Sequence, residues 1–392
     1  MKKLDYNATV RACGYSYIIQ GILNNFLPLL FITFRRMYSL NYEQISFLIF
    51  LNFGVQMLVD ILSAKYVDKL GYRKSVILSM FLTFLGFLLL SVLPNLMSNH
   101  YFGIIIPVVI YAVGGGLIET VASPILQACP IDNKDARMSM LHSYYCWGHI
   151  LTVLVSSVYF YVFGTSNWKW LALFWSLIPF AVMFLFFKVP ILSLSDNGET
   201  MEHKKLVGMP IFWIFIVLMF CSGASEQGIS QWISSFAEAG LGIDKTVGDI
   251  FGTTVFAFFM GCSRLIYAKF SKKINLVRFM IISGIMCAVM YITAAISSSP
   301  AFSLASCVLC GLTVGIMWPG IYNISQVAIL GGGTGLFAYL ALAGDIGCAG
   351  GPGLLGMVSS AFSDNLKIGI LFASVFPIVF VIMMLILKKK IK

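Results

Sequence analysis

Charged side chains are scarce in this sequence of 392 residues. Asp, Glu, Lys and Arg together make up 11% of the chain, against about 25% in an average soluble domain. Hydrophobic residues make up 59%, and a surface so poor in charge needs lipid rather than water as its solvent. At about 20 apolar residues per span, the chain has room for about twelve transmembrane helices and for no large soluble domain. This composition weighs against a conventional enzyme.

The sequence also lacks the motifs of an ATP-driven pump. The run Gly331-Gly332-Gly333 has no Walker lysine after it and no strand before it, so it indicates a flexible turn rather than a phosphate-binding loop. Energy for transport would then come from a gradient. The nine cysteines fall almost entirely within apolar stretches, where thiols pack as small apolar side chains. Even Cys307 and Cys310, spaced as CxxC, lie mid-span, so we expect no metal and no cofactor.

Long apolar runs separated by polar residues predict twelve spans. The first six lie near 14–34, 44–64, 75–94, 103–128, 138–163 and 168–187, and the last six near 210–236, 247–270, 275–297, 301–329, 334–361 and 366–387. Lys and Arg are about four times as frequent on the side of the N-terminus as on the opposite side, and loops rich in them stay in the cytoplasm. We therefore expect a multi-pass protein of the bacterial inner membrane with both termini cytoplasmic. The net charge of +10 follows from this bias, so no nucleic-acid partner is expected.

The longest polar segment, 188–209, reads as a cytoplasmic linker. It separates a predicted six-helix bundle over 1–187 from a second one over 210–392. An internal repeat supports the division, because Ala64–Leu70 aligns with Ala268–Ile274 at an offset of 204 residues. Both segments end an even-numbered span. Duplicated halves are the layout of two-repeat secondary transporters, whose sites lie near the bilayer midplane.

The loop after the second span resembles the signature loop of the major facilitator superfamily, G-x-L-A-D-R-x-G-R-R. Four of its positions are in register: Asp68, Lys69, Gly71 and Arg73. Ala64 replaces the first Gly, and Tyr72 replaces the first basic residue of the closing pair. The resemblance implies an all-α membrane protein with twelve helices in two six-helix bundles. It also implies a cytoplasmic gate, for which the candidates are the charged residues at the cytoplasmic ends of their spans: Asp60, Asp68, Arg73 and Arg264.

A finer resemblance is to the fucose–galactose–glucose proton symporters. The stretch Gly114–Pro124 is similar to their G-x-G-x-x-E-T-x-x-N-P pattern, and Gly223 to Glu226 followed by Trp232 is similar to their G-x-E…W pattern. The pair Asn24-Asn25 in the first span is also seen in that group. Two departures matter: Pro28 stands where the group has a protonatable Asp, and Ser123 replaces its Asn. The fold carries over, whereas a fucose substrate does not.

Three carboxyl groups lie close to the middle of predicted spans: Glu119, Glu226 and Asp345. An ionisable group in the bilayer core costs about 2.5–3.5 kcal/mol on insertion scales, so such groups are functional candidates by default. A carboxyl that can be either neutral or charged is what proton coupling requires. We expect Glu119 to be the proton carrier and Glu226 to hydrogen-bond the solute. The alternative for each, and most of all for Asp345, is a hydrogen bond between helices that serves packing alone.

Amide, aromatic and histidine side chains recur in the same spans. Each amide offers both a donor and an acceptor to a hydroxyl group, although some of them must join helices to one another. His142 and His149 are seven residues apart on one helix face, with no third metal ligand spaced nearby, and a single membrane His more often bonds a neighbouring helix than carries a proton. The favoured solute ligands are Gln20, Asn24, Asn25, Glu119, His142, Glu226, Gln227, Trp232, Trp318 and Asn323.

These observations favour a proton-coupled importer of a sugar or a similar polyhydroxylated solute. We expect a monomer whose partners are the solute, protons and the lipid bilayer. The first alternative is an exporter of apolar drugs or lipids on the same fold, which the 33 Phe and 19 Met residues would suit. The second is a membrane-embedded enzyme or a substrate-sensing receptor, but the sequence offers neither a catalytic constellation nor a signalling domain.

Overall fold

The computed structural model describes residues 5–40, 42–194, 201–242, 248–363 and 365–391, and within them every regular element is a helix. The first group is α1 (Tyr6–Leu29), α2 (Phe31–Tyr38), α3 (Tyr42–Leu70), α4 (Tyr72–Leu96), α5 (His100–Ala128), α6 (Lys134–Phe163) and α7 (Trp168–Lys188). The second group is α8 (His203–Val207), α9 (Pro210–Ser230), α10 (Ile233–Ser235), α12 (Val255–Phe270), α13 (Leu276–Ile296), α14 (Pro300–Val314), α15 (Met317–Ala328), α16 (Gly333–Ala361), α17 (Leu366–Ala373) and α18 (Val375–Lys390). Short 3₁₀ and π segments occupy Thr165–Asn167, Phe236–Gly240 and Gly248–Thr254.

Eleven helical segments of the described chain are long and apolar enough to cross a membrane, or twelve when the bent pair α1 and α2 counts as one span. This confirms the predicted fold class. The expected first span, 14–34, is wrong in detail, because the helix begins at Tyr6 and bends by 45° between Leu29 and Phe31. The Asp5 carboxylate caps its start by accepting from the Ala8 amide, and Pro28 lies in the last turn of α1.

The helices group by contact into two compact units. Unit 1 comprises 1–132, 147–199 and 333–338, and unit 2 comprises 133–146, 200–332 and 339–392. Helix α6 is therefore divided, since its part up to Cys146 belongs to unit 2 and its part from Trp147 belongs to unit 1. The predicted division into 1–187, 188–209 and 210–392 follows the order of the spans along the chain, whereas the two units follow contacts between helices. The division therefore stays a prediction.

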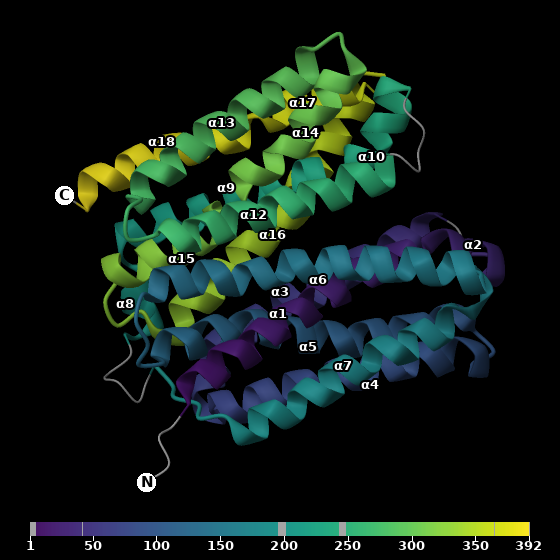
Figure 1. Cartoon of the computed structure of the whole chain (residues 1–392), viewed down its shortest axis with the longest axis horizontal. Helices are drawn as coiled ribbons and strands as arrows, with labels where there is room; N and C mark the ends of the chain where they lie inside the picture. The colour runs from purple at the N-terminus through teal and green to yellow at the C-terminus, as the bar shows by residue number, and fades with distance from the viewer. Residues whose placement is uncertain (1–4, 41, 195–200, 243–247, 364, 392) are drawn as a thin grey trace. The chain divides into compact units, whose positions relative to one another are not determined.

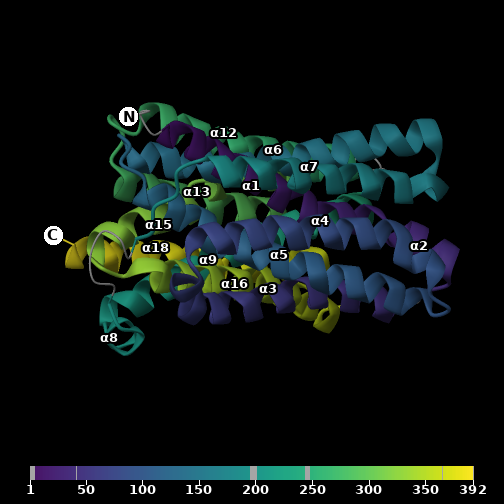
Figure 2. The same cartoon turned by 90° about the horizontal axis from the view of Figure 1, so that it is seen from below.

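Unit 1 is a bundle in which α4 packs against both α5 and α7, and α5 also packs against α1 and α3 (Figure 1). Helix α2 lies at the end of this bundle away from the start of α1, as both views show (Figure 2). Small residues permit the closest approaches. Ser79 on α4 donates its hydroxyl to the carbonyl of Gly114 on α5 at 2.7 Å. Such small and hydroxylated contacts are typical of helices packed within a membrane.

Unit 2 contains α9, α12 to α15, α17, α18 and most of α16. Helix α13 runs alongside α18, and the short α8 lies at the end of the unit where α18 finishes (Figures 1 and 2). Helices α9 and α16 approach so closely that a Cβ on Gly223 would collide with the carbonyl of Gly344. A Cβ on Gly347 would likewise collide with the carbonyl of Phe220. These glycines fix the register between α9 and α16.

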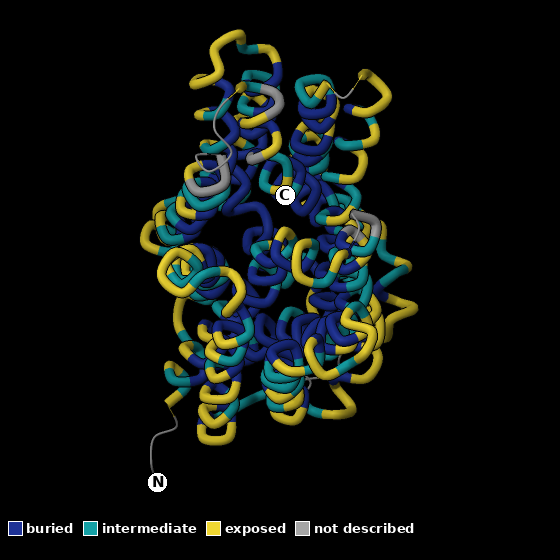
Figure 3. The backbone as a smooth tube through the Cα atoms, turned by 90° about the vertical axis from the view of Figure 1, so that its right-hand side faces the viewer, coloured by how far each residue is buried: buried dark blue, intermediate teal, exposed yellow. Residues whose placement is uncertain are grey.

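Apolar side chains cover both the buried and the outer faces of the helices. Figure 3 shows dark, buried residues alternating with exposed ones around most helices. The exposed set includes large apolar side chains such as Phe50 (71%), Tyr161 (92%) and Met357 (70%). A water-soluble protein rarely exposes so many. The outer faces are thus suited to lipid, as the composition predicts.

Candidate functional site

Four amide side chains of unit 1 form a hydrogen-bonded cluster between α1 and α3. Gln20 Nε2 donates to Gln56 Oε1 at 2.8 Å. Gln56 Nε2 and Asn52 Nδ2 both donate to Asn24 Oδ1, at 3.1 and 3.2 Å. Gln20, Asn52 and Gln56 are buried, whereas Asn24 is half-buried. We call these four residues the amide cluster.

Helix α5 completes the amide cluster with a carboxylate and a glycine. Gln20 Nε2 also lies 3.4 Å from Oε2 of Glu119, which is half-buried. One turn earlier, a Cβ on Gly115 would lie 3.1 Å from Gln56 Oε1 and 3.2 Å from Gln20 Oε1. The absence of a side chain at Gly115 therefore makes room for both amides. This glycine explains part of the Gly-rich stretch that the sequence singled out.

Two predicted residues near the amide cluster have other partners. Asn25 Nδ2 donates to the carbonyl of Gly21 on its own helix at 2.8 Å. Ser123, which replaces the Asn of the resembling group, shares a 2.9 Å hydrogen bond with the hydroxyl of Tyr17. Tyr17 was not among the expected residues.

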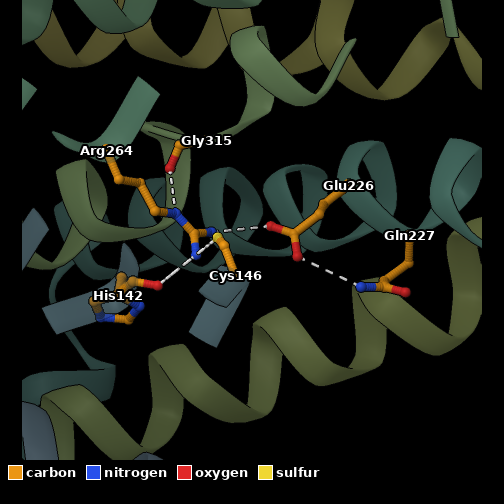
Figure 4. A network of polar contacts seen from close by, with 6 residues as sticks. All are labelled: His142, Cys146, Glu226, Gln227, Arg264 and Gly315. Atoms are coloured by element: carbon orange, nitrogen blue, oxygen red, sulfur yellow. Dashed lines mark hydrogen bonds and ion pairs between the residues drawn. The ribbon is translucent and has the colours of Figure 1, made fainter. Parts of the chain in front are cut away.

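A second polar cluster lies in unit 2 around Arg264 of α12 (Figure 4). Its Nη2 lies 3.3 Å from Oε2 of Glu226 on α9, and both side chains are buried. Arg264 Nε donates to the carbonyl of Gly315 at 2.8 Å. Its Nη1 donates to the carbonyl of His142 at 2.8 Å and to Cys146 Sγ at 3.2 Å. We call these five residues the arginine cluster.

The arginine cluster joins four elements of unit 2. Gly315 lies at the break between α14 and α15, so Arg264 supplies a donor where the helix is interrupted. Two further hydrogen bonds join the first half of α6 to α12 and α15. Ser139 Oγ donates to the carbonyl of Arg264 at 2.7 Å, and Asn323 Nδ2 of α15 donates to the carbonyl of Asp135 at 3.1 Å.

The remaining expected residues of α9 lie beside the arginine cluster. Gln227 Nε2 donates to Oε1 of Glu226 at 3.4 Å, and Gln227 Oε1 accepts from Gln231 Nε2 at 3.0 Å. Trp232 Nε1 donates to the carbonyl of Pro352 on α16 at 3.0 Å. Gln227 and Trp232 are half-buried, so part of each stays accessible.

The other aromatic and acidic candidates of unit 2 are buried. The His142 ring lies 5.5 Å from the ring of Tyr322. The ring of Trp318 packs where Gly344 has no side chain. The neighbouring Asp345 is 5% exposed and takes part in neither cluster.

The comparisons with known proteins agree with this architecture. The sequence model of the Major Facilitator Superfamily matches residues 13–352. The chain belongs to this superfamily. No curated protein matches the sequence.

Solved structures of two sugar transporters share the major facilitator fold of this chain. FucP, a fucose:proton symporter of E. coli, in the outward conformation, is 14% identical with a TM-score of 0.82, and the match covers 96% of this chain and 97% of FucP. XylE, a proton:xylose symporter bound to 6-bromo-6-deoxy-D-glucose, is 10% identical with a TM-score of 0.82, and the match covers 96% and 94% of the two chains. Identities this low establish the fold and leave the substrate open.

The signature loop of this facilitator makes defined contacts within unit 1. Asp68 accepts a hydrogen bond from the hydroxyl of Thr334, in the first turn of α16, and the Tyr72 hydroxyl bonds the same Thr334 oxygen. Arg73 Nη1 and Nη2 donate to the carbonyls of Phe186 and Val189, at 2.7 and 2.8 Å. Arg73 thus caps the C-terminal end of α7, where cations are favoured.

Two of the four expected gate residues depart from the expected arrangement. Asp60 is fully buried on α3. Arg264 is buried as well, and its partners are Glu226, His142, Cys146 and Gly315 rather than a loop at the end of a span. The gating role that the sequence predicts for Asp60 and Arg264 stays a prediction.

Sequence reasoning missed the partner of Arg264, although a signal was present. Arg264 is the one Lys or Arg assigned to the interior of a predicted span, and a cation in hydrocarbon requires a counter-charge. Glu226 lies in the neighbouring predicted span and could supply that counter-charge. Its carboxylate was instead assigned to the solute. By contrast, no sequence signal marks Thr334, Cys146 or the carbonyl of Gly315 as partners.

Proposed function

We propose that this chain is a secondary active transporter that imports a sugar or a similar polyhydroxylated small solute together with protons, by alternating access. It would act as a monomer in a bacterial inner membrane with both termini in the cytoplasm. The superfamily assignment supports transport, and the shared fold with FucP and XylE supports the sugar and the proton. The observation that carries the proposal is the amide cluster.

The amide cluster suits a hydroxylated solute. Its donors and acceptors are held within apolar helices, where an unpaired polar group is costly. Asn24 and Glu119 are half-buried, so they have surface left for a ligand, while Gln20, Asn52 and Gln56 hold them in place. An exporter of apolar drugs would gain nothing from such a set.

Unit 2 has polar and aromatic side chains of its own that suit a hydroxylated solute. Trp232 presents a half-buried indole whose Nε1 is fixed by Pro352, and Gln227 offers an amide beside it. Aromatic faces flanked by polar groups are typical of small-molecule sites. Four more residues remain proposed ligands, and each would have to exchange a present contact for a contact with the solute: Asn25, His142, Trp318 and Asn323.

The experiment is uptake of a panel of labelled sugars into membrane vesicles, with and without an inward proton gradient. We expect accumulation of at least one sugar above its external concentration when the gradient is present, and only equilibration when it is absent. Accumulation driven equally without a gradient would refute coupling. Extrusion of hydrophobic dyes with no sugar uptake would instead support the exporter.

A further inference from the structure

The proton coupling in the proposed function needs a carboxyl that gains and loses a proton during the cycle. Because Pro28 stands where the resembling symporters have a protonatable Asp, the carrier must lie elsewhere. The three carboxyls that the sequence places near the middle of the membrane, Glu119, Glu226 and Asp345, differ in their surroundings, and those differences separate their roles.

Glu226 has a permanent counter-charge. Its Oε2 lies 3.3 Å from Arg264, and its Oε1 lies near the Gln227 amide. Arg264 in turn is held by Gly315 and His142 carbonyls. Protonating Glu226 would leave the buried guanidinium without an anion, and a buried charge without its partner is strongly destabilising. Glu226 is therefore suited to staying ionised.

Glu119 is in a polar environment. It is half-buried and lies within hydrogen-bond reach of the Gln20 amide. Donor amides stabilise the ionised form of a carboxyl. Glu119 can thus keep its charge while it binds a hydroxyl of the solute.

Asp345 differs from both in that no ion pair joins it to another of the described residues. It is 5% exposed near the middle of the membrane-spanning helix α16, and its Oδ2 has no hydrogen-bond partner among the residues that the structure describes. In that part of the chain no Lys or Arg forms an ion pair with it. An ionised carboxyl in such a place is very costly.

The helices packed on this part of α16 bring no cation to Asp345. Helix α9 meets α16 at Gly223 and Gly344, and its single charged residue, Glu226, is bound to Arg264. Helix α15 contributes the ring of Trp318 and has no charged residue.

Cys348 lies one turn after Asp345 on α16, and two further titratable groups lie toward the two ends of this helix. Near the C-terminal end, Gly369 of α17 contacts Ser359, and Lys367 of the same helix donates to the carbonyl of Ser297. Near the N-terminal end, His203 lies against the ring of Tyr339. Neither Lys367 nor His203 forms an ion pair with Asp345.

We propose that Asp345 is the residue that carries the coupling proton, and that it is protonated in the conformation described here. This assignment rests on the proposed function and moves the carrier from Glu119, the first choice from sequence, to α16. On the cytoplasmic side the carboxyl O–H bond of Asp345 breaks and water accepts the proton as hydronium; on the outer side hydronium returns a proton to the carboxylate and leaves water. Glu226 and Glu119 stay ionised throughout.

The test compares Asp345→Asn with Glu119→Gln and Glu226→Gln, using the sugar that wild-type vesicles accumulate. Each variant keeps the shape of its side chain and cannot ionise. We expect Asp345→Asn to lose accumulation under a proton gradient and to retain exchange of internal for external sugar. Glu119→Gln should still accumulate sugar, at altered affinity. Accumulation by Asp345→Asn, or its loss in Glu119→Gln with exchange intact, overturns the proposal. Absence of accumulation in wild type refutes the proposed function instead.

A second measurement needs no variant. A hydrophobic carbodiimide reacts with protonated carboxyls in apolar surroundings: the O–H adds across a C=N bond and the adduct rearranges to a stable N-acylurea, so the whole reagent is retained. We expect mass spectrometry of the labelled wild-type protein to find the adduct on Asp345 and not on Glu226. Labelling of Glu226 or Glu119 in place of Asp345 contradicts the assignment.

If Asp345→Asn does not reach the membrane, Asp345→Glu decides the question. The extra methylene alters the surroundings of the carboxyl without removing it. We expect the pH at which accumulation is half-maximal to move relative to wild type. A purely structural Asp345 would leave that pH unchanged, and this result would overturn the proposal.

Discussion

At the scale of single residues, the amide cluster depends on a glycine as well as on its polar side chains. Gly115 gives Gln20 and Gln56 the space in which they meet, since a Cβ there would lie 3.1 to 3.2 Å from both amide oxygens. Contacts that short require the amides to shift by a few tenths of an ångström. A hydrogen bond of 2.8 Å between two fixed helices has little room for such a shift.

We therefore expect Gly115→Ala to weaken sugar binding without preventing folding. Losing one hydrogen bond is worth about 1 kcal/mol, or roughly a fivefold rise in the apparent dissociation constant. Counterflow at varied sugar concentration measures this change. Gly54→Ala on α3 is the matched control, because a Cβ there meets nothing within 4 Å. Equal effects of the two substitutions would count against the amide cluster as the solute site.

The buried pair of Arg264 and Glu226 gives a second prediction at this scale. Arg264→Met leaves Glu226 as an uncompensated buried charge, and the loss of stability is expected to be about 3–5 kcal/mol. The double variant Arg264→Met with Glu226→Gln removes both charges and should recover part of the loss. Thermal unfolding in detergent, followed by size-exclusion chromatography, measures both. An additive double variant would mean that the two side chains do not interact.

At the scale of helices, the predicted spans agree well with the structure where hydropathy decides. The prediction of 103–128 compares with α5 at His100–Ala128, and 168–187 compares with α7 at Trp168–Lys188. The ends differ because helices continue past the apolar core until a cap stops them, as Asn99 does for α5 by accepting from the amides of Tyr101 and Phe102. Hydropathy does not predict the bend after α1, because it carries no information on the direction of a helix axis.

The candidate site was less predictable than the helices. In unit 1 hydrogen bonds connect three of the predicted ligands, Gln20, Asn24 and Glu119, through Gln56, while their role in binding stays a prediction. Their partners could not be read from spacing, because Gln20 and Glu119 are 99 residues apart. In unit 2 the bonds of Arg264 go largely to backbone carbonyls, and every residue has one. Tertiary packing selects which carbonyl is reached.

A prediction at the scale of helices concerns the signature loop. Asp68 bonds Thr334 in the first turn of α16, where the helix dipole favours a negative charge by about 0.3–1 kcal/mol. Asp68→Asn keeps an acceptor and removes the charge. We expect it to slow transport far more than it weakens binding, as separate uptake and equilibrium-binding measurements would reveal. Equal losses in both would indicate misfolding.

At the scale of the whole molecule, the distribution of Lys and Arg predicts the orientation in the membrane. Lys388, Lys389 and Lys390 end α18, while few cations occupy the opposite ends of the spans. Positive loops are retained on the cytoplasmic side during insertion. The sequence thus predicts which end of every helix faces the cell interior. The helix ends in the structure are therefore the positions at which this prediction can be tested.

We expect a cysteine introduced at Lys389 to be protected from a membrane-impermeant maleimide in intact cells, and to react once the cells are opened. A cysteine at Ser166, in the exposed 3₁₀ turn between α6 and α7, should react in intact cells. We expect the two positions on opposite sides because seven candidate spans of the described chain, the one that contains α7 and the six that follow it, separate them in an alternating path. Most native cysteines are buried, and a variant lacking Cys262 and Cys348, the two half-buried ones, lowers the background. The opposite pattern, reaction at Lys389 and protection at Ser166 in intact cells, would place the C-terminus outside, and reaction at both sites would contradict an odd number of spans between them.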